Sequence, residues 1–187
     1  MHYCLLLITE QFPTNKVIDD AIGQYNDDEV YGQENVVYPP FMWDWWQVGG
    51  RYAGRFKLSV SDEEMYRWGF YLQEPRCGRL FRSYLLEDAK KYADKTRDAW
   101  CFREEDYFTT MGFRDGYLYV DGGKISDITN VDDFSCYCFV DRNGQAFSRS
   151  RWDGNKWTDE DETFDDKLKS ALAESKDCYA CVIDIHD

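Results

Sequence analysis

The chain has 187 residues with 36 acidic and 22 basic side chains, which give it a formal net charge of −14. Its apolar content of 43% is enough for the core of one domain that folds without a covalent staple. Such an acidic chain repels nucleic-acid phosphates, so its charge disfavours direct binding to DNA or RNA. The charge serves either attraction to a basic partner or plain solubility.

The beginning of the chain has no basic leader, and its apolar run ends by Thr9, which predicts neither a secretory signal nor a membrane-spanning segment. The seven cysteines are an odd number, which is typical of reduced thiols in a cytoplasm. Two close pairs, Cys136/Cys138 and Cys178/Cys181, fall in expected strands rather than in the turns that zinc sites use. We therefore expect small buried side chains, and neither a metal site nor a cofactor.

In the first half of the chain, apolar periodicity separates expected elements from polar loops. Residues 2–9 are apolar on both faces, as a central strand is, and residues 17–25 have helical spacing. Residues 26–40 are polar and contain glycine and proline, which predicts a loop. A strand is expected over residues 52–60 and a longer helix over residues 83–106.

The second half is expected to be richer in strands. Asn143-Gly144 predicts a tight hairpin turn, because both residues tolerate positive φ. Thr158 or Asp159 is the expected cap of a helix whose apolar residues recur every four positions. The expected elements are a strand over 117–120, a turn at 121–123, hairpin strands over 134–140 and 145–151, a helix over 159–174 and a strand over 178–187.

This order of elements predicts one α+β domain, residues 1–187, in which helices pack on a mostly antiparallel sheet. The first and last strands are expected in the same sheet. Residues 61–130 are either part of this domain or an inserted helical or irregular subdomain.

The densest unusual cluster has three tryptophans in four positions, followed by two glycines and an arginine. One interpretation is a stacking pocket for a nucleobase or a partner side chain, in which Arg51 clamps a phosphate or carboxylate, or contacts Asp44 or Asp184. The other is an aromatic plug that seals one end of the sheet, with Asp44 pairing Arg51 internally. The candidate residues are Trp43, Asp44, Trp45, Trp46, Gly49, Gly50 and Arg51.

Asp184 and His186 are candidates in the last strand, where a separation of two positions puts them on one face. Such a pair can act as a base with its orienting group or contribute to a metal site. The other histidine, His2, begins the first strand, and we expect it at the opposite end of the ladder from His186. That placement disfavours a two-histidine metal site.

A further candidate surface is acidic. Carboxylates crowd the start of the helix expected over residues 159–174, where they suit the positive end of the helix dipole. They form either a solvated face or an interaction surface. The candidates are Asp159, Glu160, Asp161, Glu162, Asp165 and Asp166.

The string WDWWQVGGRYAGRFKL, residues 43–58, resembles a W-D-W-Y/W-x-I/V-G-G-R-W-x-G-F motif of a family of uncharacterised proteins encoded by bacteriophages and prophages. The C-terminal order is similar too: an Asn-Gly hairpin, a stretch with Trp152 and Trp157, an acidic helix and a closing strand over residues 182–186. Tyr52 departs from the family by replacing a tryptophan, and Ile185, within that strand, replaces a cysteine. The resemblance implies a phage or prophage origin and the host bacterial cytoplasm, and no established activity.

Two functions of different classes follow. The first is an inhibitor of a bacterial defence system or host factor, similar to an anti-CRISPR, whose carboxylates mimic phosphates and occupy a basic nucleic-acid-binding surface of a protein partner. The second is a nucleotide or small-molecule binding or hydrolysing protein with its pocket at the tryptophan cluster and at Asp184 and His186. The sequence favours the first, and it leaves open whether the protein is an enzyme.

Overall fold

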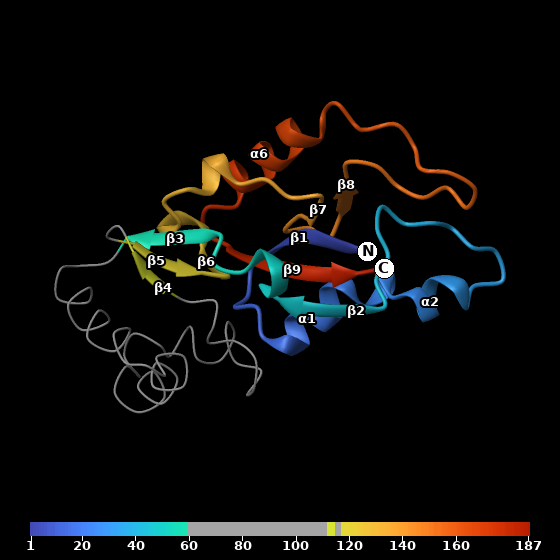
Figure 1. Ribbon diagram of the computed structural model, residues 1–187, viewed down its shortest axis with the longest axis horizontal. Helices are drawn as coiled ribbons and strands as arrows, with labels where there is room; N and C mark the ends of the chain where they lie inside the picture. Colours follow the sequence, from blue (N-terminus) through green and yellow to red (C-terminus); the bar gives the residue numbers. More distant parts are fainter. Residues whose placement is uncertain (60–111, 115–116) are drawn as a thin grey trace.

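The computed structural model describes residues 1–59, 112–114 and 117–187. A mostly antiparallel central sheet has the order β2-β9-β1-β7-β8, and β6 also pairs with β9 (Figure 1). Among the described strands of this sheet, β1 and β7 pair in parallel. The strands are β1 (His2–Thr9), β2 (Trp45–Val48), β6 (Gly122–Lys124), β7 (Cys138–Val140), β8 (Ala146–Ser148) and β9 (Tyr179–His186).

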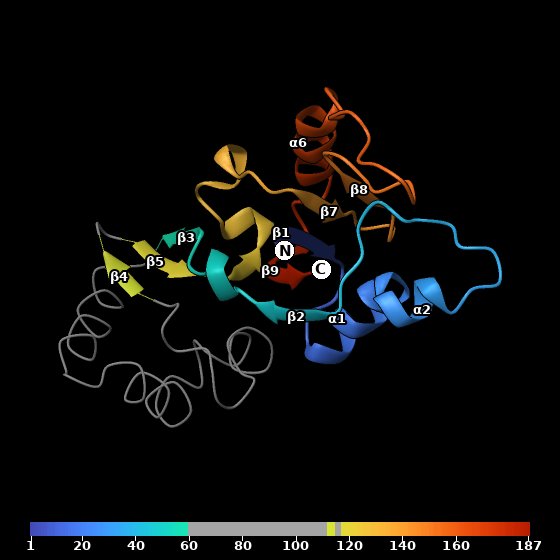
Figure 2. The ribbon, with the colours of Figure 1, turned by 45° about the vertical axis from the view of Figure 1, so that its right-hand side comes forward.

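The fold class is therefore confirmed as α+β, with the first and last strands adjacent in one sheet. Both strands are buried on both faces, as the apolar run of β1 predicts. Helix α6 (Phe164–Glu174) packs on the sheet through Phe164, whose ring meets Phe139 of β7 edge-on at 5.4 Å. Helix α1 (Asn15–Ile22) buries Ile18 and Ile22 on the other side of the sheet, as the two ribbon views agree (Figures 1 and 2).

A smaller sheet and several short helices complete the described fold. The smaller sheet has the order β3-β5-β4, with antiparallel pairs. No helix in the described ranges is long and apolar enough to cross a membrane. The remaining elements are β3 (Phe56–Ser59), β4 (Gly112–Arg114), β5 (Tyr117–Val120), α2 (Asp27–Tyr31), η1 (Gly23–Tyr25), η2 (Gly50–Tyr52), η4 (Ile125–Asp127) and η5 (Val131–Asp133).

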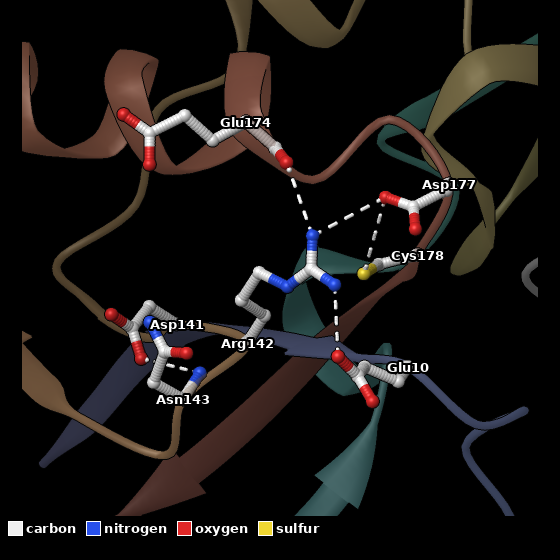
Figure 3. A network of polar contacts seen from close by, with 7 residues as sticks. All are labelled: Glu10, Asp141, Arg142, Asn143, Glu174, Asp177 and Cys178. Carbon is white, nitrogen blue, oxygen red and sulfur yellow. Dashed lines mark hydrogen bonds and ion pairs between the residues drawn. The ribbon is translucent and has the colours of Figure 1, made fainter.

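One ion-pair network connects the central sheet with α6 at the end of the sheet that is remote from the chain termini. Arg142, in the β7–β8 turn, contacts Glu10 at 2.8 Å and Asp177 at 3.4 Å (Figure 3). Its guanidinium also donates to the carbonyl of Glu174, the last residue of α6. The turn is the one expected at Asn143-Gly144, where Gly144 has φ +79°. Arg142 thus joins the ends of β1, α6 and the turn before β9.

The structure corrects the expected start of the last helix. We expected Thr158 or Asp159 to cap it, but α6 begins at Phe164, after Thr163. The hydroxyl of Thr158 instead accepts a hydrogen bond from the backbone amide of Arg151 at 3.0 Å, and the Asp161 amide donates to the Arg149 carbonyl at 2.7 Å. These bonds hold residues 158–161 beside the chain that follows β8, so the helix starts later.

Other boundaries also differ. The loop expected over residues 26–40 contains α2, because the Asn26 side chain caps that helix by accepting from the Asp28 amide. The strand expected over residues 52–60 begins at Phe56. The turn expected at residues 121–123 is partly strand, since Gly122 and Gly123 pair with β9.

The expected strands at 134–140 and 145–151 are shortened to β7 and β8. The helix expected over residues 83–106 lies outside the described residues, as does most of the segment 61–130.

Candidate functional site

The two glycines of the tryptophan cluster pack directly against buried carboxylates. Gly50 has φ +51°, and a Cβ there would lie 2.5 Å from the Asp184 side chain. Asp184 is 1% exposed, and its Oδ2 accepts a hydrogen bond from the backbone amide of Arg51 at 2.9 Å. The glycine therefore allows η2 to approach a carboxylate buried on β9.

A second carboxylate is held in the same way one residue earlier. Gly49 has φ +68°, and a Cβ there would lie 2.5 Å from Oδ2 of Asp121, which is fully buried. Oδ1 of Asp121 accepts from the backbone amide of Gly54 at 2.7 Å. The two glycines thus pack on two carboxylates of the protein itself, which accept from the amides of Arg51 and Gly54, and no external anion is needed to explain this backbone.

The tryptophans of the cluster divide between core and surface. Trp43 is half-buried and donates its Nε1 hydrogen to the carbonyl of Ile22 at 2.9 Å, while Trp46 is buried in the core. Trp45 is 44% exposed. The side chain of Arg51 is exposed, and its contact with Asp184 comes from its backbone amide rather than from the guanidinium. The buried tryptophans match the aromatic-plug interpretation more closely than a stacking pocket clamped by Arg51, but the Asp44–Arg51 pair expected with the plug is wrong, because Asp44 contacts His186 instead.

The expected separation of the two histidines is wrong. His2 and His186 face each other directly in the antiparallel β1–β9 ladder, and their ring centroids are 4.9 Å apart. The physical reason is that antiparallel pairing places the start of β1 opposite the end of β9. Each Nδ1 lies 2.9 Å from a carboxylate: His2 from Asp184 and His186 from Asp44. Trp45 is paired with His186 in the next strand and meets His2 edge-on at 6.2 Å.

The bonds of the two histidines determine which ring nitrogen is available for chemistry. Because Nδ1 of each ring bonds to a carboxylate, Nε2 is the nitrogen left to exchange a proton or contact a ligand. The carboxylate fixes the orientation of the ring, as in general-base dyads. Among the residues that the structure describes, no three or more His, Cys, Asp or Glu side chains are grouped to hold a metal ion.

An aromatic pocket lies at the same end of the sheet, next to the chain termini. Tyr3 and Tyr137 are stacked with their centroids 4.6 Å apart, and Trp157 lies 6.5 Å from Tyr3. Trp152 meets Trp157 edge-on at 6.0 Å. These four rings line the pocket together with the segment 39–42 and Asp187.

Carboxylates from separate segments act on this pocket. Burial raises the pKa of Tyr3, and the negative charge of Asp187 adds to the shift. Burial also raises the pKa of Tyr137, and the charge of Glu160 adds to it. The pKa of Asp27 is raised by burial and then by its neighbours, of which Asp187 has the largest effect. The negative potential at this end of the sheet is therefore shared between the pocket and the start of α2.

The acidic candidates at residues 159–166 are partly neutralised. Asp161 contacts Lys167 at 2.6 Å, and that bond, with two from Thr163, lowers the pKa of Asp161 to about 2. Asp165 is paired with the guanidinium of Arg149. The other four, which remain exposed, are Asp159, Glu160, Glu162 and Asp166.

Sequence reasoning missed the aromatic pocket. Its rings come from the start of β1, from the residue before β7 and from the stretch after β8, so no local spacing links them. The signals in the sequence were the aromatic content of 18% and the two tryptophans at 152 and 157.

Comparison of the chain with protein-family models, with curated proteins and with solved structures finds no match. The resemblance to phage and prophage proteins therefore stays a prediction from the sequence.

Proposed function

We propose that the protein acts by binding a basic surface of another protein, with the end of the central sheet as its binding face. The observation that carries the proposal is the convergence of carboxylates on an aromatic pocket. Asp187 lines the pocket itself, and the charge of Glu160, in the stretch before α6, acts on Tyr137. Aromatic side chains surrounded by charge are typical of the residues that dominate the binding energy of protein interfaces.

The overall charge supports the same function. The first 50 residues contain eight acidic side chains and one basic one, and the whole chain has a net charge of −14. That single basic residue, Lys16, is paired with Asp20 of α1 at 2.6 Å. A field of one sign accelerates encounter with an oppositely charged surface and disfavours partners of like charge.

The partner class that best fits these features is a host or defence-system protein with a basic nucleic-acid-binding surface. The carboxylates would occupy the positions of phosphates on that surface and block nucleic-acid binding. The resemblance to phage and prophage proteins adds the biological setting, an anti-CRISPR-like inhibitor in the bacterial cytoplasm.

Affinity purification of the tagged full chain from expressing bacteria, followed by a nucleic-acid competition assay, tests this proposal. We expect to recover a protein with a basic nucleic-acid-binding surface, whose purified form loses nucleic-acid binding when this protein is added. Recovery of partners whose nucleic-acid binding is unchanged by the added protein would contradict the proposal.

A second candidate function is favoured by one specific observation, the buried Asp184 that orients His2 at 2.9 Å. An oriented imidazole that is partly exposed is suited to proton transfer on a small molecule such as a nucleotide. Titration of nucleotides into isotope-labelled protein tests it: the ring signals of His2 and His186 should shift with saturation. His2→Gln should abolish the response, whereas an unchanged spectrum would exclude this site.

A further inference from the structure

We infer that the aromatic pocket binds the ε-ammonium group of a lysine presented by the basic partner. The inference rests on the proposed function and adds to it the chemical group at the centre of the interface. The pocket is defined by Tyr3, Tyr137, Trp152, Trp157 and Asp187.

The arrangement of the rings suits a cation. The four rings are neighbours: Tyr3 and Tyr137 are stacked at 4.6 Å, Trp157 lies 6.5 Å from Tyr3, and Trp152 lies 6.0 Å from Trp157. All four line the pocket, so a cation that enters it meets several aromatic side chains, and cation–π attraction acts within about 6 Å of a ring centroid. Indole and phenol rings are the aromatic groups that attract cations most strongly.

A carboxylate completes the site. Asp187 lines the same pocket, and its charge acts on Tyr3. The faces of the rings attract the ammonium group, but they do not accept a hydrogen bond from each of its N–H groups. The carboxylate supplies such an acceptor in a charge-assisted bond. Glu160 adds a second negative charge from the stretch before α6.

The size of the pocket selects the kind of cation. The part of it that a water-sized group can enter is about 10 Å³ in volume. That volume corresponds to roughly one water-sized group. An ammonium group has this size, whereas a planar guanidinium or a nucleobase is larger. The pocket therefore favours lysine over arginine, and it does not suit a nucleobase.

The surroundings indicate that the lysine comes from a protein. Trp157 is 46% exposed, so its ring is available to a docking surface. The exposed carboxylates Asp159 and Glu162 flank Glu160 in the chain and can contact further basic side chains of the same partner. A free alkylammonium ion would contact only the pocket and would make none of these additional contacts.

Titration of the full chain with decalysine and with decaarginine tests the inference. Trp157→Ala should weaken decalysine binding about fivefold, as expected for one cation–π contact, and decaarginine binding less than about twofold. Trp157→Phe should restore most of the decalysine affinity. Tyr31→Ala is the matched control, because Tyr31 is also an exposed aromatic side chain, 54%, and lies outside the pocket; it should leave both affinities unchanged.

The outcomes separate the inference from the proposed function. Equal weakening of both peptides by Trp157→Ala, or no weakening of either, would overturn the lysine pocket, while salt-sensitive binding of both peptides would still support an acidic binding face. Absence of salt-sensitive binding to either peptide would overturn both. If butylammonium alone binds as tightly as decalysine, the pocket is a small-cation site, and the protein partner is overturned.

Discussion

At the scale of single residues, the close packing of Gly50 on the buried carboxylate of Asp184 leaves no room for a side chain at position 50. Gly50→Ala should destabilise the fold by at least about 2 kcal/mol, because it adds a left-handed backbone penalty to a clash with the carboxylate. Its Cβ would lie 2.5 Å from Asp184. Gly144→Ala is the matched control, since Gly144 also has positive φ but nothing within 4 Å of its added Cβ.

Urea unfolding of both variants measures the difference. We expect Gly144→Ala to cost only about 1 kcal/mol, the backbone penalty by itself. Equal losses for the two variants would mean that the contact between Gly50 and Asp184 does not constrain the turn.

The buried thiols make a second prediction at this scale. Burial raises the pKa of Cys4 to about 12, and it raises the pKa values of Cys136, Cys138 and Cys181 well above the ordinary range. The reactive thiolate is therefore almost absent at pH 8. Native protein treated with iodoacetamide should stay unmodified at these positions by mass spectrometry, and unfolded protein should react at all of them. Rapid alkylation of native Cys4 would contradict this burial.

At the scale of the element, the carboxylate of Asp161 holds the segment that leads into α6. Asp161 has a pKa of about 2, below its ordinary value of 3.8, first because of Lys167 and then because of Thr163. A depressed pKa stabilises the fold above pH 3.8, and this contribution disappears as pH falls through about 2. Lys167→Met should raise the pKa of Asp161 toward 3.8, as measured by NMR titration. Lys169→Met, on the same helix, should leave it unchanged.

The elements that the sequence predicted best have apolar patterns that no local polar group overrides. The run of β1, the strand β5 and the stripe Phe164, Leu168 and Leu172 of α6 are of this kind. The start of α6 was mispredicted because Thr158 bonds to the backbone of Arg151, in the chain that follows β8, rather than to the helix, and such a bond leaves no local pattern.

The candidate site shows the same limit. Its tryptophan cluster was found from composition, but the carboxylates that explain Gly49 and Gly50 come from residues 121 and 184, far along the chain. His2 and His186 could have been placed together from the sequence, because antiparallel pairing of the terminal strands brings the first and last positions into register. The aromatic pocket required the three-dimensional fold.

At the scale of the whole molecule, the distribution of charge predicts where a basic partner docks. Asp159, Glu160 and Glu162 lie in one stretch, from which the charge of Glu160 acts on Tyr137 of the pocket, whereas Asp127, Asp132 and Asp133 belong to η4 and η5. Helix η4 lies beside the start of β9, since the Ile125 amide donates to the Cys178 carbonyl, while the pocket lies beyond the end of β9. All six side chains are exposed.

Replacing either set of three by lysine changes the net charge equally, so position alone separates the two variants. We expect the pocket-side variant to bind decalysine at least about tenfold more weakly than the η4–η5 variant at about 0.05 M salt. At about 0.3 M salt the difference should shrink, because screening shortens the reach of exposed charges to less than about 10 Å. Isothermal titration calorimetry at both salt concentrations measures this, with thermal unfolding to verify that both variants fold. Equal weakening by the two sets would show that binding follows net charge and that the end of the sheet has no special role.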